Sequence, residues 1–323
     1  MASWPWLRSW AQAFRAWSPL MVDLRSMETG DLAGYALLAF SERAEGTTVV
    51  ALGHGSSRHG CLPATDPAAA SALARAVAST VQAMRGVWSL DLEQLPDGDP
   101  TLHQLAHELS DAQLLPERRV PGVTFSTAVH LDDVLGTGMR RQLRRARARI
   151  AADGMEMSIA FDRGQAISLE LVDEVEAVHV SRDRDTRRQS DLDRPSDREF
   201  WRQVVEATSG DWEVEIASLR LDGRLAAYVV ALLDGDTYRV YDGRMCTELG
   251  PYSPGHLITA AALDRAMKDR RFAVLDWMTG VASEKLLMTN IAQRRVRLVA
   301  TSASRHFSPR PPGASREPEA QPA

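Results

Sequence analysis

A single stretch, residues 237–285, places the strongest constraint on how this chain can fold. It begins with a short alternating apolar run and then reaches a predicted polar turn at 242–244. Ser253-Pro254-Gly255 follows directly before an apolar helical pattern, and a second strand is predicted over 272–277. The order strand, loop, helix, strand requires a crossover connection whose helix packs on the sheet.

The start of this helix carries the first functional indication. Serine before proline is typical of an N-cap followed by the first helical residue, because proline has no N–H to leave unbonded there. Gly255 leaves the first backbone amides of the helix unobstructed, and such amides attract phosphate. The alternative is an ordinary helix start, since the chain contains neither a Walker loop nor a GxGxxG motif after a strand.

Composition limits the classes of partner. The chain has 323 residues, which suits two domains, and a net charge of −5, which gives no general attraction to DNA or to an anionic membrane. Two cysteines far apart indicate neither a disulfide framework nor a zinc site, and no metal-ligand spacing occurs. No apolar run approaches the roughly 18 residues of a membrane span. We expect a cytoplasmic protein without a metal ion and without membrane insertion.

The two halves of the chain resemble each other. Residues 30–40, GDLAGYALLAF, are similar to residues 223–233, GRLAAYVVALL, and the strand patterns downstream correspond at a nearly constant offset. Both halves are predicted to run strand, strand, helix, strand, helix. This correspondence favours two related domains.

Three further segments complete the predicted organisation. An arginine-rich helix is predicted over 131–152, between the two repeats. The mixed-charge segment 181–197 has no apolar cluster to bury, so we expect a mobile surface loop. The proline-rich tail from 308 onward is predicted to be disordered.

Several motifs together resemble a known family: a Trp-rich opening helix, RRQLRRARARI, DGRLAAYVVALL, YDG followed by YSPGHL, and VLDWMTG followed by EK. In this order they are similar to the two-domain GNAT-fold acetyltransferases of the cellulose-biosynthesis acetyltransferase-like type, relatives of the Fem-type ligases. The resemblance covers roughly residues 4–301. It implies an α/β (α+β) fold with two tandem GNAT-like domains, each a mixed twisted sheet with flanking helices.

The boundaries expected from this resemblance divide the chain into five parts. They are an N-terminal GNAT-like domain over 1–135, a linking segment over 136–180, a mobile charged loop over 181–198, a C-terminal GNAT-like domain over 199–307 and a disordered tail over 308–323.

The resemblance also implies a donor site. In this family the strand–loop–helix junction of the second domain holds the pyrophosphate of acyl-CoA, which here corresponds to Tyr252, Ser253, Gly255 and His256. The implied co-substrate is acyl-CoA, acetyl-CoA in the first instance.

Candidates for the chemistry follow from what acyl transfer to an amine requires, a proton acceptor for the amine and stabilisation of the departing thiolate. Asp242, at the end of a predicted strand, is the first choice as base or amine anchor, with a simple Asp-Gly turn as the alternative. Tyr241 or Tyr252 would protonate the thiolate, or else pack. Lys285 would bind an anionic group, or lie exposed on a final helix.

The acceptor side is predicted from a separate set of residues. His54 and Arg58 occupy the loop of the first repeat that corresponds to the 242–244 segment. Asp276 lies on a strand, where it binds substrate or accepts structural hydrogen bonds. Arg144 and Arg145 lie on the arginine helix, which either grips phosphate groups or pairs with the acidic stretch 170–176.

Three functions remain open from the sequence. The first is an N-acyltransferase that moves an acyl group from acyl-CoA directly to an amine of a small-molecule acceptor, without a covalent enzyme intermediate. The second is a Fem-like ligase that takes its aminoacyl group from tRNA, although the acidic balance of the chain is unusual for a tRNA binder. The third is a non-catalytic binding protein with the GNAT fold, which the glutamate at Glu284 beside Lys285 favours, since family members usually carry an aromatic residue there.

Overall fold

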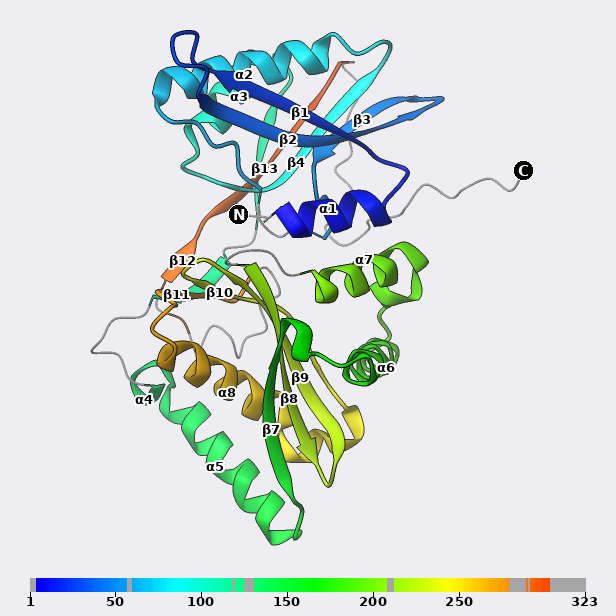
Figure 1. Ribbon diagram of the computed structural model, residues 1–323, viewed down its shortest axis with the longest axis vertical. Helices are drawn as coiled ribbons and strands as arrows, with labels where there is room; N and C mark the ends of the chain where they lie inside the picture. The colour runs from blue at the N-terminus through cyan, green and yellow to red at the C-terminus, as the bar shows by residue number, and fades with distance from the viewer. Residues whose placement is uncertain are drawn as a thin grey trace. The chain divides into compact units, whose positions relative to one another are not determined.

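The computed structural model describes residues 4–56, 60–117, 120–124, 131–207, 212–278, 289 and 291–302. The chain divides into two compact units between residues 118 and 119 and between residues 293 and 294, and its first and last parts together belong to the first unit. Each unit is built around its own mixed sheet (Figure 1). Arg58 and Lys285, two predicted site residues, lie outside the described residues, as does Glu284.

The first unit contains a six-stranded sheet in the order β1-β2-β3-β4-β13-β5. Its strands are β1 (Ser18–Arg25), β2 (Leu32–Arg43), β3 (Gly46–Ala51), β4 (Trp88–Pro96), β13 (Arg295–Thr301) and β5 (Gln113–Pro116). The opening helix α1 spans Trp4–Ala13, while α2 (Pro67–Gln82) and α3 (Pro100–Glu108) pack against each other. Apolar side chains of α2, α3 and the central strands form one buried core.

The second unit contains a seven-stranded sheet in the order β12-β6-β11-β10-β9-β8-β7. The strands are β6 (Val120–Thr124), β7 (Met157–Arg163), β8 (Trp212–Leu221), β9 (Arg224–Asp234), β10 (Thr237–Met245), β11 (Val274–Asp276) and β12 (Ile291–Gln293). Among them, β8 and β9 form a hairpin. Asp222 and Gly223 both have positive φ at its turn, as the tight turn between two antiparallel strands requires.

Helices cover both faces of this second sheet (Figure 1). On one face α8 (Pro254–Lys268) packs on β8, β9 and β10, and α5 (Thr137–Ala152) packs against α8; the short α4 (Leu131–Val134) precedes α5. On the other face α6 (Leu169–Asp185) packs on β9 and β10, and α7 (Pro195–Glu206) follows it. Three short 3-10 helices, η1 (Gly164–Ala166), η2 (Asp191–Asp193) and η3 (Thr247–Tyr252), connect these elements.

The predicted internal repeat is confirmed in the sheet topology. In the first unit β1, β2 and β3 pair antiparallel, and β4 joins β3 in parallel after α2. In the second unit β8, β9 and β10 pair antiparallel, and β11 joins β10 in parallel after α8. The two mixed sheets with flanking helices therefore correspond element by element up to β11.

The predicted domain boundaries differ from the observed ones because two strands pair far from their sequence neighbours. The strand β6 was expected in the first domain, but it lies between β11 and β12 in the second sheet. Conversely, β13 was expected in the second domain and instead lies between β4 and β5 in the first sheet. The segment 136–180 was expected to link two domains, but it contributes α5, β7 and most of α6 to the second unit.

Two local predictions are also wrong. The segment 181–198 is not an irregular loop: it contains the last turn of α6, the η2 turn and the start of α7. It is ordered by buried contacts, because Asp183, Ser190 and Leu192 are buried despite the charged composition. The polar turn expected at 242–244 is likewise absent, since β10 continues through these residues to Met245.

Candidate functional site

The parallel strands of the second sheet part soon after they meet. Strands β10 and β11 pair only over Thr237–Arg239 and Val274–Asp276. At Tyr241 the register between β10 and β9 shifts, which marks a bulge, and β10 then continues to Met245. From Val240 onward β10 therefore has no strand neighbour on its β11 side among the residues described. Bulges of this kind often adjoin active sites.

The helix that follows begins without a side-chain cap. Ser253 occupies the N-cap position that the sequence predicted, but its φ of 50° and ψ of 44° are left-handed and its side chain makes no capping hydrogen bond. Pro254 is the first helical residue. The first amides of α8 therefore keep the partial positive charge of a helix N-terminus without an internal acceptor from this side chain.

Neighbouring residues fix this helix start in place. Arg149 of α5 donates from Nη1 to the carbonyl oxygen of Pro251 at 2.9 Å. The hydroxyl of Tyr252 donates to Asp153 at 2.8 Å, and the His256 ring lies 3.1 Å from the Gln142 amide. The side chains of Tyr252 and His256 are thus held by α5 and the turn that ends it. This leaves the backbone amides of the helix start, rather than these two side chains, available to a ligand.

The equivalent helix of the first unit starts differently. Asp66 is the N-cap of α2, and its carboxylate accepts a hydrogen bond from the Ala69 amide at 2.8 Å. A carboxylate at this position already supplies the negative charge that a phosphate would bring. Moreover, β3 pairs with β4 over Thr47–Val50, four of its six residues. Of these two equivalent sites, as far as the structure describes them, the one in the second unit combines an uncapped helix start with parted strands.

A cluster of polar side chains lies on the α6 face of the second sheet. The Asp242 Oδ2 atom accepts from the Tyr228 hydroxyl at 2.7 Å and lies 3.0 Å from His179 Nδ1. Its Oδ1 atom accepts from Arg244 Nη1 at 2.6 Å. Asp183 completes the cluster, because it lies 3.0 Å from His179 Nε2 and accepts from Arg244 Nε at 3.1 Å.

The fold explains why these residues meet. After the bulge at Tyr241, Asp242 and Arg244 lie opposite Val230 and Tyr228 of β9, so all four share one face of the sheet. His179 and Asp183 are one helical turn apart on α6, which packs on that face. Without the bulge, the side chains of Asp242 and Arg244 would point to the α8 face instead.

The surroundings of Asp242 determine its protonation. Burial would raise the pKa of this carboxyl group, but Arg244, His179 and Tyr228 together hold the pKa well below its usual range. The pKa of the Tyr228 hydroxyl is raised well above its usual value, first by burial and then by the negative charge of Asp242. A carboxylate this stable in its ionised form is a poor proton acceptor. The site therefore favours the amine-anchor or positioning role of Asp242 over the role of general base.

The other predicted site residues in the described part of the chain lie on different elements. Tyr241 is the bulge residue of β10. Asp276 accepts from Arg239 at 2.9 Å and from the Met278 amide at 2.7 Å, which is the structural role considered for it. Arg144 and Arg145 are exposed on α5. His54 belongs to the first unit, where its Nδ1 atom lies 3.6 Å from Glu93.

The acidic stretch did not pair with the arginine helix as one alternative supposed. Glu174 instead forms an ion pair with Arg220 of β8, and Glu176 accepts from Arg202 of α7 at 2.8 Å. His179, Tyr228, Arg244 and Asp183 were not predicted from the sequence as site residues. The spacing of His179 and Asp183 on one helix was a usable signal, whereas Tyr228 lies inside an apolar strand and gives none.

The described part of the chain was searched for metal-binding groups and for membrane-spanning helices. There, no three His, Cys, Asp or Glu side chains are grouped so that they could hold a metal ion. Nor does any described helix combine the length and the apolar character needed to cross a membrane.

A known domain family matches the part of the chain that contains this site. Residues 137–286 match the family model of the acetyltransferase (GNAT) domain, and this match supports acyl transfer as the general reaction class. The matched range contains the bulge, the start of α8 and the polar cluster. No curated protein sequence matches the chain.

Solved structures show the same fold over most of the chain. FemX is similar with a TM-score of 0.61 at 10% identity, over 89% of this chain and 90% of that one. A tandem GNAT protein from the clavulanic acid biosynthesis pathway has a TM-score of 0.52 at 15% identity, over 92% and 88%. The C-terminal domain of a protein from Agrobacterium fabrum, provisionally assigned as a lysylphosphatidylglycerol synthetase, has a TM-score of 0.57 at 12% identity, over 93% and 87%.

Proposed function

We propose that the second unit transfers an acyl group from acyl-CoA, with acetyl-CoA as the first donor to test, directly to the amine of a small-molecule acceptor. The observation that carries this proposal is the combination of an uncapped helix start at Ser253 with the parting of β10 from β11 beyond Arg239. The match of residues 137–286 to an acetyltransferase domain supports the same reaction class.

The donor would lie along these two features. The pyrophosphate of CoA would accept hydrogen bonds from the first amides of α8, near Gly255. The amide groups of the extended pantetheine chain would pair with the backbone of β10 beyond Val240, as a peptide adds to a strand edge. This places the thioester towards the bulge at Tyr241.

The reaction itself forms a C–N bond and breaks a C–S bond. The neutral amine attacks the thioester carbonyl, the thiolate leaves, and the proton lost by the amine passes to solvent or to the thiolate. The ionised Asp242 would attract the acceptor amine and fix the positions of His179 and Tyr228. In this scheme Asp242 is a positioning residue.

Titration calorimetry with CoA tests the donor site. Gly255→Val places a branched side chain at the second helical position of α8, where its Cβ atom would lie 3.3 Å from the Sδ atom of Met245. Because the Met245 side chain is flexible, we expect the fold to persist and CoA affinity to fall about tenfold or more. Gly138→Val changes the corresponding position of α5, in open surroundings, and is the matched control.

The same variants distinguish the alternatives. Equal CoA affinity in wild type, Gly255→Val and Gly138→Val would overturn the donor site. Binding and turnover with an aminoacyl-tRNA in place of acetyl-CoA would support the Fem-like ligase. Binding of acetyl-CoA without turnover of any tested amine would support a non-catalytic GNAT-fold binding protein.

A further inference from the structure

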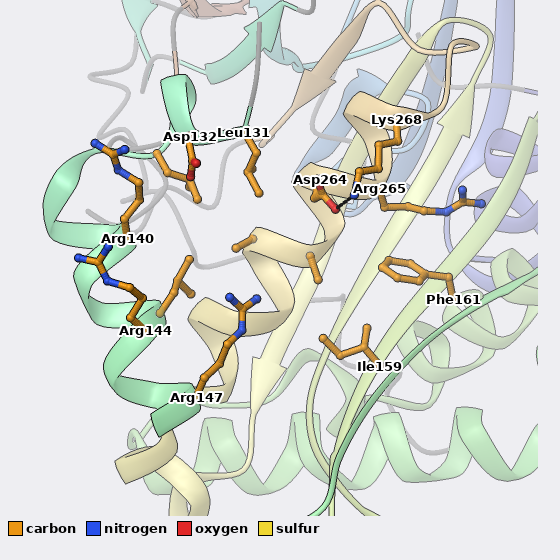
Figure 2. A pocket seen from close by; sticks show the side chains of 14 residues that line it. Leu131, Asp132, Arg140, Arg144, Arg147, Ile159, Phe161, Asp264, Arg265 and Lys268 are labelled. Carbon is orange, nitrogen blue, oxygen red and sulfur yellow. Dashed lines mark hydrogen bonds and ion pairs between the residues drawn. The ribbon is translucent and has the colours of Figure 1, made fainter. Parts of the chain in front are cut away.

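A groove of about 630 Å³ lies on the α8 face of the second unit, between α5, α8 and β7 (Figure 2). Its floor is apolar, with Ala260 and Ala261 contributed by α8 and with Ile159 and Phe161 contributed by β7. Grooves that bind small molecules are typically about 300–1,000 Å³ and mostly apolar with a few placed polar groups. The volume and floor of this groove fit that description.

Positive charge gathers around this floor from two elements. Arg140, Arg144 and Arg147 follow one stripe of α5, at helical spacing, and line one side (Figure 2). Arg265 and Lys268 of α8 also line the groove. The two acidic side chains in the lining are Asp132 and Asp264, so the cations outnumber the acids.

Some of these cationic side chains are already paired with neighbouring groups, and others are not. Lys268 pairs with Asp264 at 2.6 Å, and the Arg265 guanidinium lies over the Phe161 ring, 5.7 Å from its centroid, and 3.8 Å from Glu215. Arg144 and Arg147, in contrast, make no hydrogen bond or ion pair with any residue that the structure describes. These two guanidinium groups are the ones that a ligand would engage.

The packing of α5 explains why its arginines line the groove. The buried side of α5, which includes Leu143, Ala146 and Ile150, belongs to the core that also contains α8. The arginine stripe lies next to this buried side, and its three arginines line the groove together with the apolar floor. A ligand in the groove would contact both.

We propose that this groove binds an organic phosphate, a small molecule that joins a phosphate group to a compact apolar group. Guanidinium groups bind phosphate oxygens through paired hydrogen bonds, and two unpaired arginines on one wall suit a dianion. The apolar floor would cover the other half of the ligand. On α8 the lining of the groove begins at Ala260, five residues and about 7.5 Å of helix beyond Gly255, and Gly255 is not among the lining residues.

Calorimetry on the full chain with 1-naphthyl phosphate tests the proposal. Inorganic phosphate and 1-naphthol serve as the two halves of this probe. We expect 1-naphthyl phosphate to bind at least about tenfold more tightly than either half, because only the whole molecule uses both the arginines and the floor. Equal affinity for inorganic phosphate and 1-naphthyl phosphate would overturn the apolar part of the proposal.

Variants locate the binding. Arg144→Gln with Arg147→Gln should weaken 1-naphthyl phosphate binding about tenfold. Arg141→Gln with Arg145→Gln removes the same charge from exposed positions of α5 that do not line the groove, and should leave binding unchanged. Ala261→Phe fills the floor without changing charge and should also weaken binding. Equal losses in the two arginine double variants would show a non-specific charge effect and overturn the site.

Two further measurements separate this groove from the proposed donor site and from a membrane-binding surface. Gly255→Val should retain 1-naphthyl phosphate binding, which keeps a failure at the proposed donor site distinct from a failure here. Vesicles of phosphatidylglycerol and phosphatidylcholine test the other source of phosphate. Vesicle binding that depends on Arg144 and Arg147, without any binding of 1-naphthyl phosphate, would replace the small-molecule ligand with a membrane surface.

Discussion

The Asp242 carboxylate accepts hydrogen bonds from Arg244 and Tyr228 and lies within 3.0 Å of His179, while its side chain is only 12% exposed. The protonation of this aspartate is set by the side chains around it rather than by its residue type alone. Asp-Gly in a sequence indicates a turn, yet here the same pair lies within a strand and its aspartate joins a buried network. The neighbours keep the carboxyl group ionised, which limits it to binding and positioning.

We expect Asp242→Asn to lower the free energy of unfolding by roughly 2 kcal/mol. The substitution removes the negative charge beside Arg244 and turns an amide N–H₂ group towards one of the donors around it. The loss stays below the largest values for buried pairs because Arg244 retains Asp183 as a partner. Urea unfolding measures the change, and Asp236→Asn, on an exposed turn, is the control. Equal stability of the two variants would contradict the network.

Acid should destabilise the wild type more than it destabilises Asp242→Asn. The pKa of Asp242 is lower in the folded protein than in the unfolded chain, where it is near 4. The folded state therefore gains stability from this group above about pH 4, and loses that gain as the pH falls below it. Unfolding curves between pH 7 and pH 3 should converge for the two proteins. Parallel curves over this range would show that the group is not responsible.

The two repeated helices α2 and α8 differ in how their first turns are capped. Both begin after a strand and both have proline at the first position, yet Asp66 caps α2 with its own carboxylate while Ser253 leaves α8 uncapped. The same topology therefore presents an occupied helix start in one unit and an available one in the other.

Segment 181–198 shows how tertiary contacts order a charged sequence. Its residues form helical turns because Asp183 and Leu192 are buried against the rest of the unit.

Removing the two N-cap side chains should have unequal effects. Asp66→Ala loses the hydrogen bond to the Ala69 amide and should lower stability by about 1 kcal/mol, as lost helix caps generally do. Ser253→Ala should change stability by only a few tenths of that amount, because this serine makes no capping bond. Thermal unfolding of both variants measures the difference. A larger loss for Ser253→Ala would mean that its hydroxyl does cap α8.

For the whole molecule, the exchange of strands between sequence halves is the main organising fact. The last strand, β13, pairs on both sides in the first sheet, while β6 from before the second repeat pairs on both sides in the second sheet. Each unit therefore depends on a segment that the sequence places beside the other unit. Its core is complete only when that distant strand is present.

Substitutions in β13 should consequently destabilise the first unit. Leu298 is fully buried in the core with β4 and α2, so Leu298→Ala should cost about 3 kcal/mol. Hydrogen exchange should then quicken in β1 to β5 and remain near wild type in β8 to β10. Leu275→Ala in β11 is the matched control and should produce the opposite pattern. Faster exchange confined to the second unit in Leu298→Ala would contradict the strand assignment.

Neighbouring residues were sufficient to predict the local elements and the repeat. The apolar alternation from residue 237 predicted β10, and Ser253-Pro254 located the start of α8, because each depends on the conformational preferences of neighbouring residues. The similarity of residues 30–40 to residues 223–233 predicted the repeat. These patterns also led to the correct fold class and, by resemblance, to acyl transfer as the reaction class.

The long-range strand pairs and the contacts among the polar side chains could be established only from the folded chain. The bulge at Tyr241 shifts the register and turns Asp242 and Arg244 towards α6, where His179 and Asp183 complete the cluster. Nothing in residues 237–245 specifies a partner more than fifty residues away, because side-chain pairing across a sheet depends on register and on the packing of a separate helix. The pKa of Asp242, and with it the chemistry open to this residue, is set by those contacts.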